Sequence, residues 1–416
     1  MSKGTPRPSR ASGHFFQALA AGCLLLAGLP AAAAAAGAGA GSALDIGMVY
    51  GDPTLTQPGS SPGRASANPL YRQLRDGLEA YRARWGSLPQ TGIAAGPALR
   101  PGGSGERVRA LRHRLGLAEE GDFDAELARA LREYQAAHGL PDDGVAGART
   151  LASLNQGATY YERLIQLNME RARALPAELG RRYVLVDTAA ARLWMYEDGE
   201  AVDSMRVIVG KPESQTPMMA SLIRYAVLNP YWNVPDDLVR SRIAPNVLRL
   251  GLPYLRERGY EVLAGWAEDS PQLDPATVDW NAVAAGRERL RVRQRPGAGN
   301  MMGDIKFRMP NDLGIYLHDT PDRTLFDAED RRLSSGCVRL EDAQRLSRWL
   351  FGRRVAAASP DPEQRVDLAE PVPIYITYFT AAPSEQGIAF RDDVYGRDEA
   401  GLARLAGGTA ELASGQ

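Results

Sequence analysis

The N-terminal half of the chain carries apolar residues at helical spacing in two separated stretches. The first begins at Asn68-Pro69, and its apolar positions recur every three or four residues: Leu70, Leu74, Leu78 and Tyr81. The second runs from Thr159 to Leu175 with the same period. Apolar residues at this spacing form one buried face of a helix. We therefore predict a scaffold of two packed helices, supplied by residues 41–98 and 157–181.

Three shorter helices are predicted between these two stretches. Apolar-periodic segments within residues 106–155 are separated by turn signals at Phe123-Asp124, His138-Gly139 and Asp143-Gly144. A glycine after the last periodic residue is typical of a helix end. Residues 99–156 are thus expected to form a small three-helix bundle inserted in the scaffold. We interpret His138 as a capped turn residue and not as a ligand.

The hydrophobic period changes from helix to strand at Arg182. Short strands are expected at residues 183–187, 193–196, 205–209, 222–228, 315–317 and 372–379. The turn Asp198-Gly199 joins two of them into a hairpin. Residues 235–299 return to a helical pattern, with Asp274-Pro275 as one helix start. The predicted fold class is multidomain α+β, with a mostly-β domain at 182–381 that carries a helical capping insertion at 235–299.

The two ends of the chain differ from the rest. Positive residues (Lys3, Arg7, Arg10) precede an apolar run from about Phe15 to Leu29 and an alanine tract. This order predicts a secretory signal peptide at 1–36 and therefore a periplasmic protein. An uncleaved N-terminal anchor at the inner membrane is the alternative. Residues 382–416 are expected to be a C-terminal tail, disordered or a frayed helix after about Ala400.

Charge and cysteine content narrow the class of protein. The formal net charge is -1, so no nucleic-acid-binding surface is expected. Cleavage of the signal peptide would remove one of the two cysteines and leave Cys337 as the only thiol, without an internal disulfide partner. In an oxidising compartment such a thiol is a liability unless it has a use. The alternative is that Cys337 is a buried, unreactive residue of the core with a structural role only.

The sequence around Cys337 favours a nucleophile. Ser-Ser-Gly precedes it, and a glycine lets the backbone turn tightly enough to present the thiol. A cysteine nucleophile needs an adjacent base or cation. His318 is the only histidine in the predicted β domain, so it is the one histidine available as base within that domain. One histidine and one cysteine are too few for a zinc site, and no metal or cofactor is predicted.

This pair and its surroundings resemble the L,D-transpeptidase (YkuD-type) catalytic domain, from about Tyr183 to Phe379. The resemblance is carried by SSGCVRL at 334–340, YLHDTP at 316–321, VGKPESQTP at 209–217, NPYWNVP at 229–235 and GAGNMMGDIKF at 297–307. Many members have histidine where this chain has Ser335, but the large class with an inserted cap also looks like Ser-Ser-Gly-Cys. Residues 131–155 resemble the C-terminal half of a type 1 peptidoglycan-binding domain.

The resemblance implies a reaction. Cys337 would attack the carbonyl that joins the third residue of a peptidoglycan stem tetrapeptide to D-alanine, with His318 as general base and acid. Backbone amides near Ser335, Gly336 and Cys337 would hold the oxyanion. D-alanine would leave, and a neighbouring stem's amine would take the acyl group in a 3→3 cross-link. The capping insertion would exclude water.

Three further residues have open roles. Arg339 could orient the loop or meet a substrate carboxylate, or it could form a structural salt bridge. Asp319 could orient His318, although a backbone carbonyl often fills that role in this family. Tyr316 lies two residues before His318 on the same expected strand face and could line the pocket. Trp232 and Asn233 are interpreted as structural.

The expected partners are peptidoglycan stem peptides and glycan, together with carbapenems that would acylate an exposed thiolate at Cys337. A second hypothesis is an L,D-carboxypeptidase or endopeptidase, in which water takes the acyl group. A third is a non-catalytic cell-wall-binding scaffold. The acceptor amine, the binding of glycan by the bundle and the oligomeric state stay open at this stage.

Overall fold

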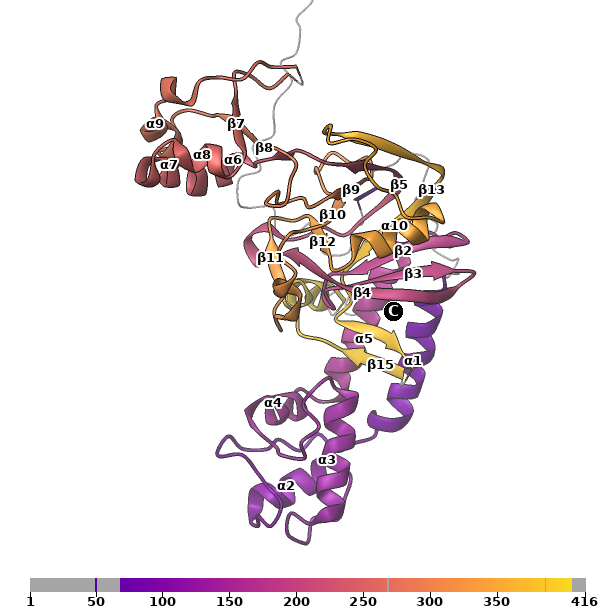
Figure 1. Ribbon diagram of the computed structural model, residues 1–416. Coiled ribbons are helices and arrows are strands. Elements are labelled where there is room, and N and C mark those ends of the chain that lie inside the picture. Colours follow the sequence, from indigo (N-terminus) through magenta and orange to yellow (C-terminus); the bar gives the residue numbers. More distant parts are fainter. Residues whose placement is uncertain (1–48, 51–67, 268, 386, 406–416) are drawn as a thin grey trace, which may run out of the picture. The chain divides into compact units, whose positions relative to one another are not determined.

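The computed structural model describes residues 49–50, 68–267, 269–385 and 387–405 (Figure 1). The predicted signal peptide at 1–36 and the end of the predicted tail at 406–416 lie outside these residues. Among the helices that are described, none is both long enough and apolar enough to cross a membrane.

The predicted helical scaffold is confirmed. It consists of α1 (Pro69–Trp85) and α5 (Ala158–Arg173), which pack against each other. Asn68 caps α1, because its side-chain oxygen accepts a hydrogen bond from the Tyr71 amide at 2.9 Å. The Asn68 Nδ2 atom donates to the Ala172 carbonyl at 2.9 Å and so ties the start of α1 to the end of α5.

The three-helix bundle is also present, as α2 (Glu106–Arg114), α3 (Ala125–Ala137) and α4 (Ala148–Gln156). Asp124 caps α3 by accepting from the Leu127 amide at 2.8 Å. His138 is the C-cap of α3, and Gly139 follows with a φ of 65°. The turn residue His138 is more deeply enclosed than expected, with 5% of its surface exposed.

The mostly-β domain is one large sheet that closes into a barrel. Its strands are β1 (Val49–Tyr50), β2 (Arg182–Asp187), β3 (Arg192–Glu197), β4 (Glu200–Gly210), β5 (Met219–Leu228), β9 (Ile305–Arg308), β10 (Leu317–His318), β11 (Arg332–Ser334), β12 (Val338–Leu340) and β13 (Gln364–Thr377). The strand order is β1-β5-β13-β2-β3-β4-β12-β10-β9, with β11 beside β4. A further pairing of β5 with β9 closes the barrel.

Alternating side chains of β2 divide the core into two parts. Val184 and Val186 point into the barrel interior, where α10 (Ala343–Phe351) also packs its apolar face. Tyr183 and Leu185 point the other way and join the core of the helical scaffold. Because a strand turns successive side chains to opposite faces, one short strand serves both cores.

One predicted strand differs from the observed one next to the candidate site. Residues 315–317 were expected to be extended, but β10 contains only Leu317 and His318. The side chain of Asn311 accepts from the Ile315 amide at 2.9 Å and donates to the Ile315 carbonyl at 2.8 Å. These bonds take the backbone groups that a strand partner would need, so Ile315 stays in a loop.

The insertion at 235–299 contains the expected helical segments, but it also includes strands that were not predicted. Its helical segments are α6 (Asp236–Leu238), η2 (Val239–Ile243), α7 (Ala244–Leu250), α8 (Pro253–Glu257), η3 (Pro275–Thr277) and α9 (Trp280–Ala284). A sheet of β6 (Trp232–Asn233), β8 (Arg291–Gln294) and β7 (Tyr260–Leu263) accompanies them. In β8 the buried positions alternate with arginines, and this short pattern is too weak to stand out.

The predicted C-terminal tail is structured up to residue 405. β14 (Ala381–Ser384) and β15 (Gly387–Phe390) form a hairpin that contacts α1, and residues 398–405 are helical. Arg171 of α5 donates to the Asp398 carboxylate at 2.8 Å, and both side chains are buried. The segment is held by partners far away in the sequence, so its own composition did not predict order.

Candidate active site

The register of two short strands places the candidate residues on one face of the barrel. β10 and β12 run parallel, with Leu317 opposite Val338 and His318 opposite Arg339. Leu317 and Val338 are fully buried in the barrel interior. Since side chains alternate, His318 and Arg339 lie on the outer face. Cys337 immediately precedes β12, two residues before Arg339, and reaches the same cavity as His318.

That cavity has a volume of about 70 Å³. Its lining residues come from the barrel face, the cysteine loop and both ends of the insertion: Trp232, Pro235, Leu238, Met301, Met302, Tyr316, His318, Ser334, Ser335, Cys337 and Arg339. Two methionines, Trp232 and Leu238 supply most of the apolar wall. Trp232 therefore does more than the structural role expected for it, since it borders the reactive thiol.

The loop before Cys337 is pinned by two hydroxyl groups. Ser334 Oγ donates to the Cys337 carbonyl at 2.6 Å and accepts from the Gly336 amide at 3.1 Å. Thr216 Oγ1 donates to the Gly336 carbonyl at 2.8 Å and accepts from the Gly210 amide at 2.8 Å. Gly336 has a φ of 110°, which a residue with a side chain adopts only with strain. The thiol is therefore presented by a rigid turn.

Not all of the backbone amides that were expected to bind the oxyanion are available to do so. The Gly336 amide is used inside the loop, by Ser334, and Ser335 is exposed at the surface. The Cys337 amide makes no backbone hydrogen bond to any of the described residues. Of the amides that the sequence indicated, the one on Cys337 is thus the best placed to receive a developing negative charge.

The thiol of Cys337 is partly covered, and this differs from the expected exposed thiolate. Burial raises its pKa, while hydrogen bonds from Tyr316 and the positive charges of Arg339 and Lys306 act in the opposite direction. The Sγ atom lies 3.8 Å from the Gly314 carbonyl. Burial thus favours the neutral thiol, whereas the surrounding groups favour the thiolate.

His318 is held in one tautomer. Its Nδ1 atom lies 2.6 Å from the Asp319 carbonyl, which can only accept, so the proton is on Nδ1 and the lone pair is on Nε2. Burial, followed by the charge of Arg339, lowers the pKa of His318 to about 3. The imidazole is thus neutral at physiological pH, and Nε2 can accept a proton.

The Asp319 side chain does not face the imidazole. Its carboxylate accepts from Arg323 at 2.6 Å and from the Asp304 amide at 3.1 Å. A side chain at Gly303 would collide with this carboxylate, since a Cβ atom there would lie 2.4 Å from Oδ2. The hypothesis that the Asp319 carboxylate orients His318 is therefore wrong. The Asp319 carbonyl does so, while its side chain fixes the loop at 303–304.

Tyr316 and Arg339 lie where the sequence suggested. The Tyr316 ring borders the cavity, with its centroid 5.7 Å from that of His318. Arg339 also borders the cavity, and its Nε atom has no hydrogen-bond partner among the described residues. A structural salt bridge of Arg339 is thus not observed in the described part of the chain.

Sequence reasoning missed Lys306. It pairs with His318 across β9 and β10, is 7% exposed, and has its Nζ atom 5.3 Å from the centroid of the Tyr316 ring. Burial lowers its pKa. The segment GDIKF, which carries part of the resemblance, contains this residue, but nothing in a one-dimensional pattern showed that the lysine would be buried.

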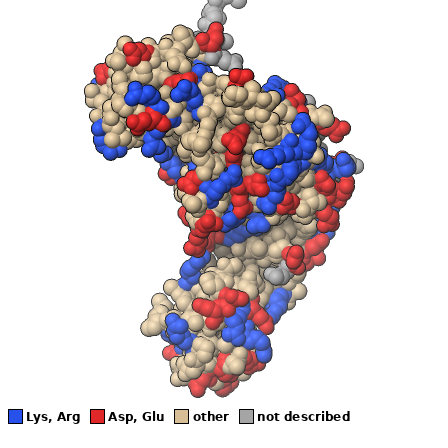
Figure 2. Space-filling model, in the orientation of Figure 1, with Lys and Arg blue, Asp and Glu red and all other residues tan. Residues whose placement is uncertain are grey.

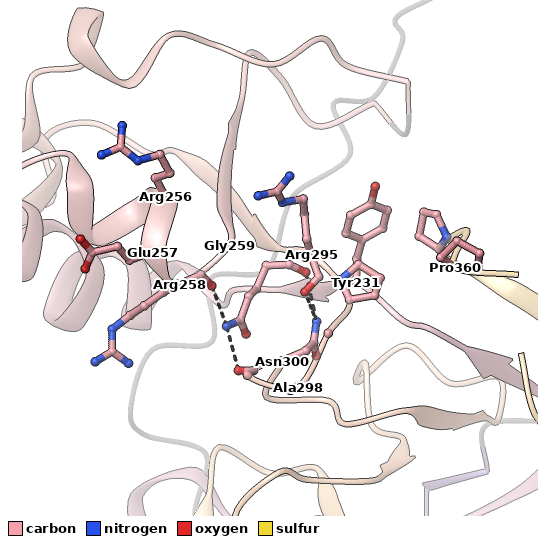
Figure 3. Close-up of a pocket in the computed structure, with 14 residues that line it drawn as sticks. Tyr231, Arg256, Glu257, Arg258, Gly259, Arg295, Ala298, Asn300 and Pro360 are labelled. Atoms are coloured by element: carbon pink, nitrogen blue, oxygen red, sulfur yellow. Dashed lines mark hydrogen bonds between the residues drawn. The ribbon is translucent and has the colours of Figure 1, made fainter.

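A much larger hollow lies elsewhere, near the base of the insertion (Figure 3). It measures about 680 Å³ and is bordered by Arg256, Arg258 and Arg295 together with Tyr231. Gln294 Nε2 donates to the Arg258 and Gly299 carbonyls, each at 3.0 Å, and so shapes its wall. No cysteine or histidine borders it, so we assign the chemistry to the smaller cavity.

The face drawn in Figure 2 and the described metal-ligating side chains do not point to another site. On the face drawn in Figure 2, basic and acidic side chains are interspersed over the surface. The described residues contain no group of three or more His, Cys, Asp or Glu side chains that could hold a metal ion.

Fold and site together define a β-barrel domain with a cysteine nucleophile candidate and a neutral histidine. Residues 181–373 match the family described as L,D-transpeptidase catalytic domain, and residues 104–154 match the family described as "Putative peptidoglycan binding domain". Residues 181–373 are therefore similar to the L,D-transpeptidase catalytic domain, and residues 104–154 are similar to a peptidoglycan-binding domain. Both resemblances seen in the sequence are confirmed.

The chain is also similar to individual proteins. A protein of Haemophilus influenzae described as "Putative L,D-transpeptidase" is 32% identical over 241 residues, which are 56% of this chain and 48% of the relative. The matched region thus spans about half the length of that curated relative. Similar solved structures include an L,D-transpeptidase from Mycobacterium smegmatis, with 15% identity over 47% of this chain and 58% of that chain and a TM-score of 0.24. Another is an L,D-transpeptidase from Xylanimonas cellulosilytica, with 15% identity over 68% and 98% of the two chains and a TM-score of 0.20.

Proposed function

We propose that the protein is a periplasmic peptidoglycan L,D-transpeptidase that uses Cys337 as nucleophile and His318 as general base and acid. One observation carries the proposal. In a domain of this family, the register of β10 and β12 brings a thiol and a neutral imidazole to one small cavity. The inert core cysteine is disfavoured, because Cys337 borders this cavity on a hydroxyl-pinned turn.

The reaction can be written with these residues. The stem tetrapeptide enters with its third carbonyl at Cys337. As the S–C bond forms, the thiol proton passes to His318 Nε2, and the carbonyl electrons move to the oxygen beside the Cys337 amide. The C–N bond then breaks, and D-alanine leaves with the proton from Nε2. An amine of a second stem attacks the thioester and returns the thiol, with its own proton relayed by His318.

Transfer to an amine competes with hydrolysis. The apolar wall of Trp232, Leu238, Met301 and Met302 supports transfer, because water binds poorly to an apolar surface beside the thioester. The same thiol and imidazole would serve a carboxypeptidase or an endopeptidase. The distinction depends on which nucleophile reaches the acyl-enzyme.

The two matched domains also support a proposed location and proposed partners. Enzymes of this family act on the cell wall, so we infer export to the periplasm and contact with stem peptides and glycan. The bundle at 104–154 would hold the enzyme on its polymeric substrate. Carbapenems, whose strained carbonyl imitates the scissile one, would acylate Cys337.

Product analysis tests the proposal. Tetrapeptide-rich sacculi are incubated with the full chain, digested with a muramidase, and separated by liquid chromatography with mass spectrometry. The proposal predicts 3→3 dimers with the wild type and none with Cys337→Ala. Tripeptides without dimers would replace transfer by hydrolysis, and unchanged sacculi would contradict both activities.

A further inference from the structure

A row of polar side chains crosses the outer face of the barrel beneath the candidate site. His318 is opposite Lys306 on β9 and opposite Arg339 on β12, so the imidazole lies between two cations. All three side chains share one face, because residues in register on neighbouring strands point the same way. Tyr316 and Cys337 lie beside this row and face the same cavity.

Neither cation is neutralised within the described residues. The Lys306 side chain makes no hydrogen bond or ion pair with the described residues, and its Nζ atom lies over the Tyr316 ring, 5.3 Å from the ring centroid. The Arg339 Nε atom is buried without a partner. Buried charges usually have a counter-ion, because burial without one costs several kcal/mol.

The wider surroundings leave the row positive. Four more charged groups act on these two cations: Glu363 and Arg308 on Lys306, and Asp322 and Arg242 on Arg339. An acid and a base therefore act in opposite directions on each of the two cations. The cavity lining itself contains no carboxylate. Among the described residues, the positive charge of Arg339 therefore borders the cavity without a carboxylate in its lining.

We propose that Lys306 and Arg339 form a fixed pair of positive charges whose counter-ion is the sulfur of Cys337 when it becomes anionic. This inference rests on the proposed function and adds Lys306 to it as a positioning residue. Lys306 lies over the ring of Tyr316, and Tyr316 borders the same cavity as the sulfur of Cys337. The lysine therefore acts at a distance and through that tyrosine.

In the proposed reaction, the thiol proton moves first to His318 and then to the leaving amine. The S–H bond breaks as the S–C bond forms, and the proton moves to Nε2 of His318. An imidazolium flanked by two cations is a strong acid, so it gives the proton readily to the departing amine nitrogen. In a thiolate–imidazolium pair, the imidazolium would stabilise the thiolate. Here the two fixed cations provide that positive charge, so the pair does not need to persist.

The pH dependence of thiol alkylation tests this role. Iodoacetamide is added to the intact chain over a range of pH, and the adduct on Cys337 is followed by mass spectrometry. With Lys306→Met, alkylation at neutral pH is expected to slow about tenfold, since removing one nearby charge weakens the thiolate by roughly one pH unit. The rate limit at high pH should be unchanged. Lys306→Arg should restore most of the loss.

A matched control and a second variant complete the design. Lys211→Met removes the charge of a half-exposed lysine that already pairs with Glu213 at 3.2 Å, and it should leave the profile unchanged. If Lys306→Met does not fold, as judged by circular dichroism, Arg339→Gln provides the same comparison. An unshifted profile in a folded variant, or equal defects in Lys306→Met and Lys306→Arg, would overturn the inference. Alkylation needs no peptidoglycan, so failure of the proposed function would appear separately, as absence of cross-linked products.

Discussion

The stability of the helical region should depend on pH through His138. Its ring is stacked on Tyr134 with centroids 3.8 Å apart and lies near Phe390 at 5.5 Å. Nδ1 lies 2.8 Å from the Tyr134 carbonyl, so it carries the proton, and Nε2 accepts from the Tyr81 hydroxyl at 3.0 Å. Both ring nitrogens thus have partners in the neutral form, and protonation of Nε2 would remove the acceptor that the Tyr81 hydroxyl uses.

The size of the pH-dependent change in the free energy of unfolding follows from the pKa of His138. Burial lowers the pKa of His138 to about 4, from the 6.5 expected in the unfolded chain. Because the folded pKa is the lower one, the unfolded chain binds a proton that the folded chain does not, and stability falls as pH falls through this window. The full difference corresponds to about 3 kcal/mol, of which about 2 kcal/mol is lost by about pH 5. Above the pKa of His138 in the unfolded chain, the neutral imidazole makes its full contribution to stability.

The assay is urea unfolding of the wild type and His138→Phe from about pH 8 to about pH 5. Phenylalanine keeps a flat ring but leaves the Tyr81 hydroxyl unpaired, so the variant should be less stable at high pH by about 1–3 kcal/mol. The difference in the free energy of unfolding between the two proteins should shrink by about 2 kcal/mol at about pH 5. Other titrating groups are common to both proteins and cancel in the difference. A constant deficit across the range would refute the reasoning.

The remaining predictions concern the site and the C-terminal segment. Meropenem should add its mass to the wild type but not to Cys337→Ser as a stable adduct in intact-protein mass spectrometry, and an unmodified wild type after prolonged incubation would count against an accessible thiol. Thr216→Val removes the bond to the Gly336 carbonyl, so acylation should slow about tenfold, whereas an unchanged rate would show that the turn does not need this pin. Asp398→Ala should lower the free energy of unfolding by about 3–5 kcal/mol, because Arg171 is left buried without its partner. The double variant with Arg171→Met should recover much of that loss in the same denaturation assay.

Local periodicity predicted the helices well. The apolar faces of α1 and α5 repeat every three or four residues, and the caps at Asn68 and Asp124 are visible as sequence signals. Each of these features depends on residues a few positions apart. A single sequence therefore contains what is needed to place them.

Pairings between distant segments could not be predicted in the same way. Trp232 on β6 pairs with Gln294 on β8, and the hairpin at 381–390 is held by the helical scaffold. Strands of two to four residues carry little periodic signal, so their existence depends on partners that a linear pattern does not identify. The capping sheet and the ordered C-terminal segment were missed for this reason.

The sequence identified candidate residues for the site but not their electrostatic surroundings. Cys337 and His318 could be named because so few thiols and imidazoles exist in the chain. The direction of the Asp319 carboxylate, the unpaired Arg339 and the burial of Lys306 depend on three-dimensional neighbours. These neighbours decide whether the thiol rests neutral or charged, and no motif encodes that directly.

The most direct test of the central claim is intact-protein mass spectrometry of the enzyme with a disaccharide-tetrapeptide donor and no acceptor amine. The account predicts an adduct equal to the donor minus D-alanine, located on Cys337 by peptide mapping. It predicts no adduct on Cys337→Ala and a slower one on His318→Gln. Release of D-alanine by Cys337→Ala, or an adduct located on another residue, would contradict the assignment of Cys337 as the nucleophile.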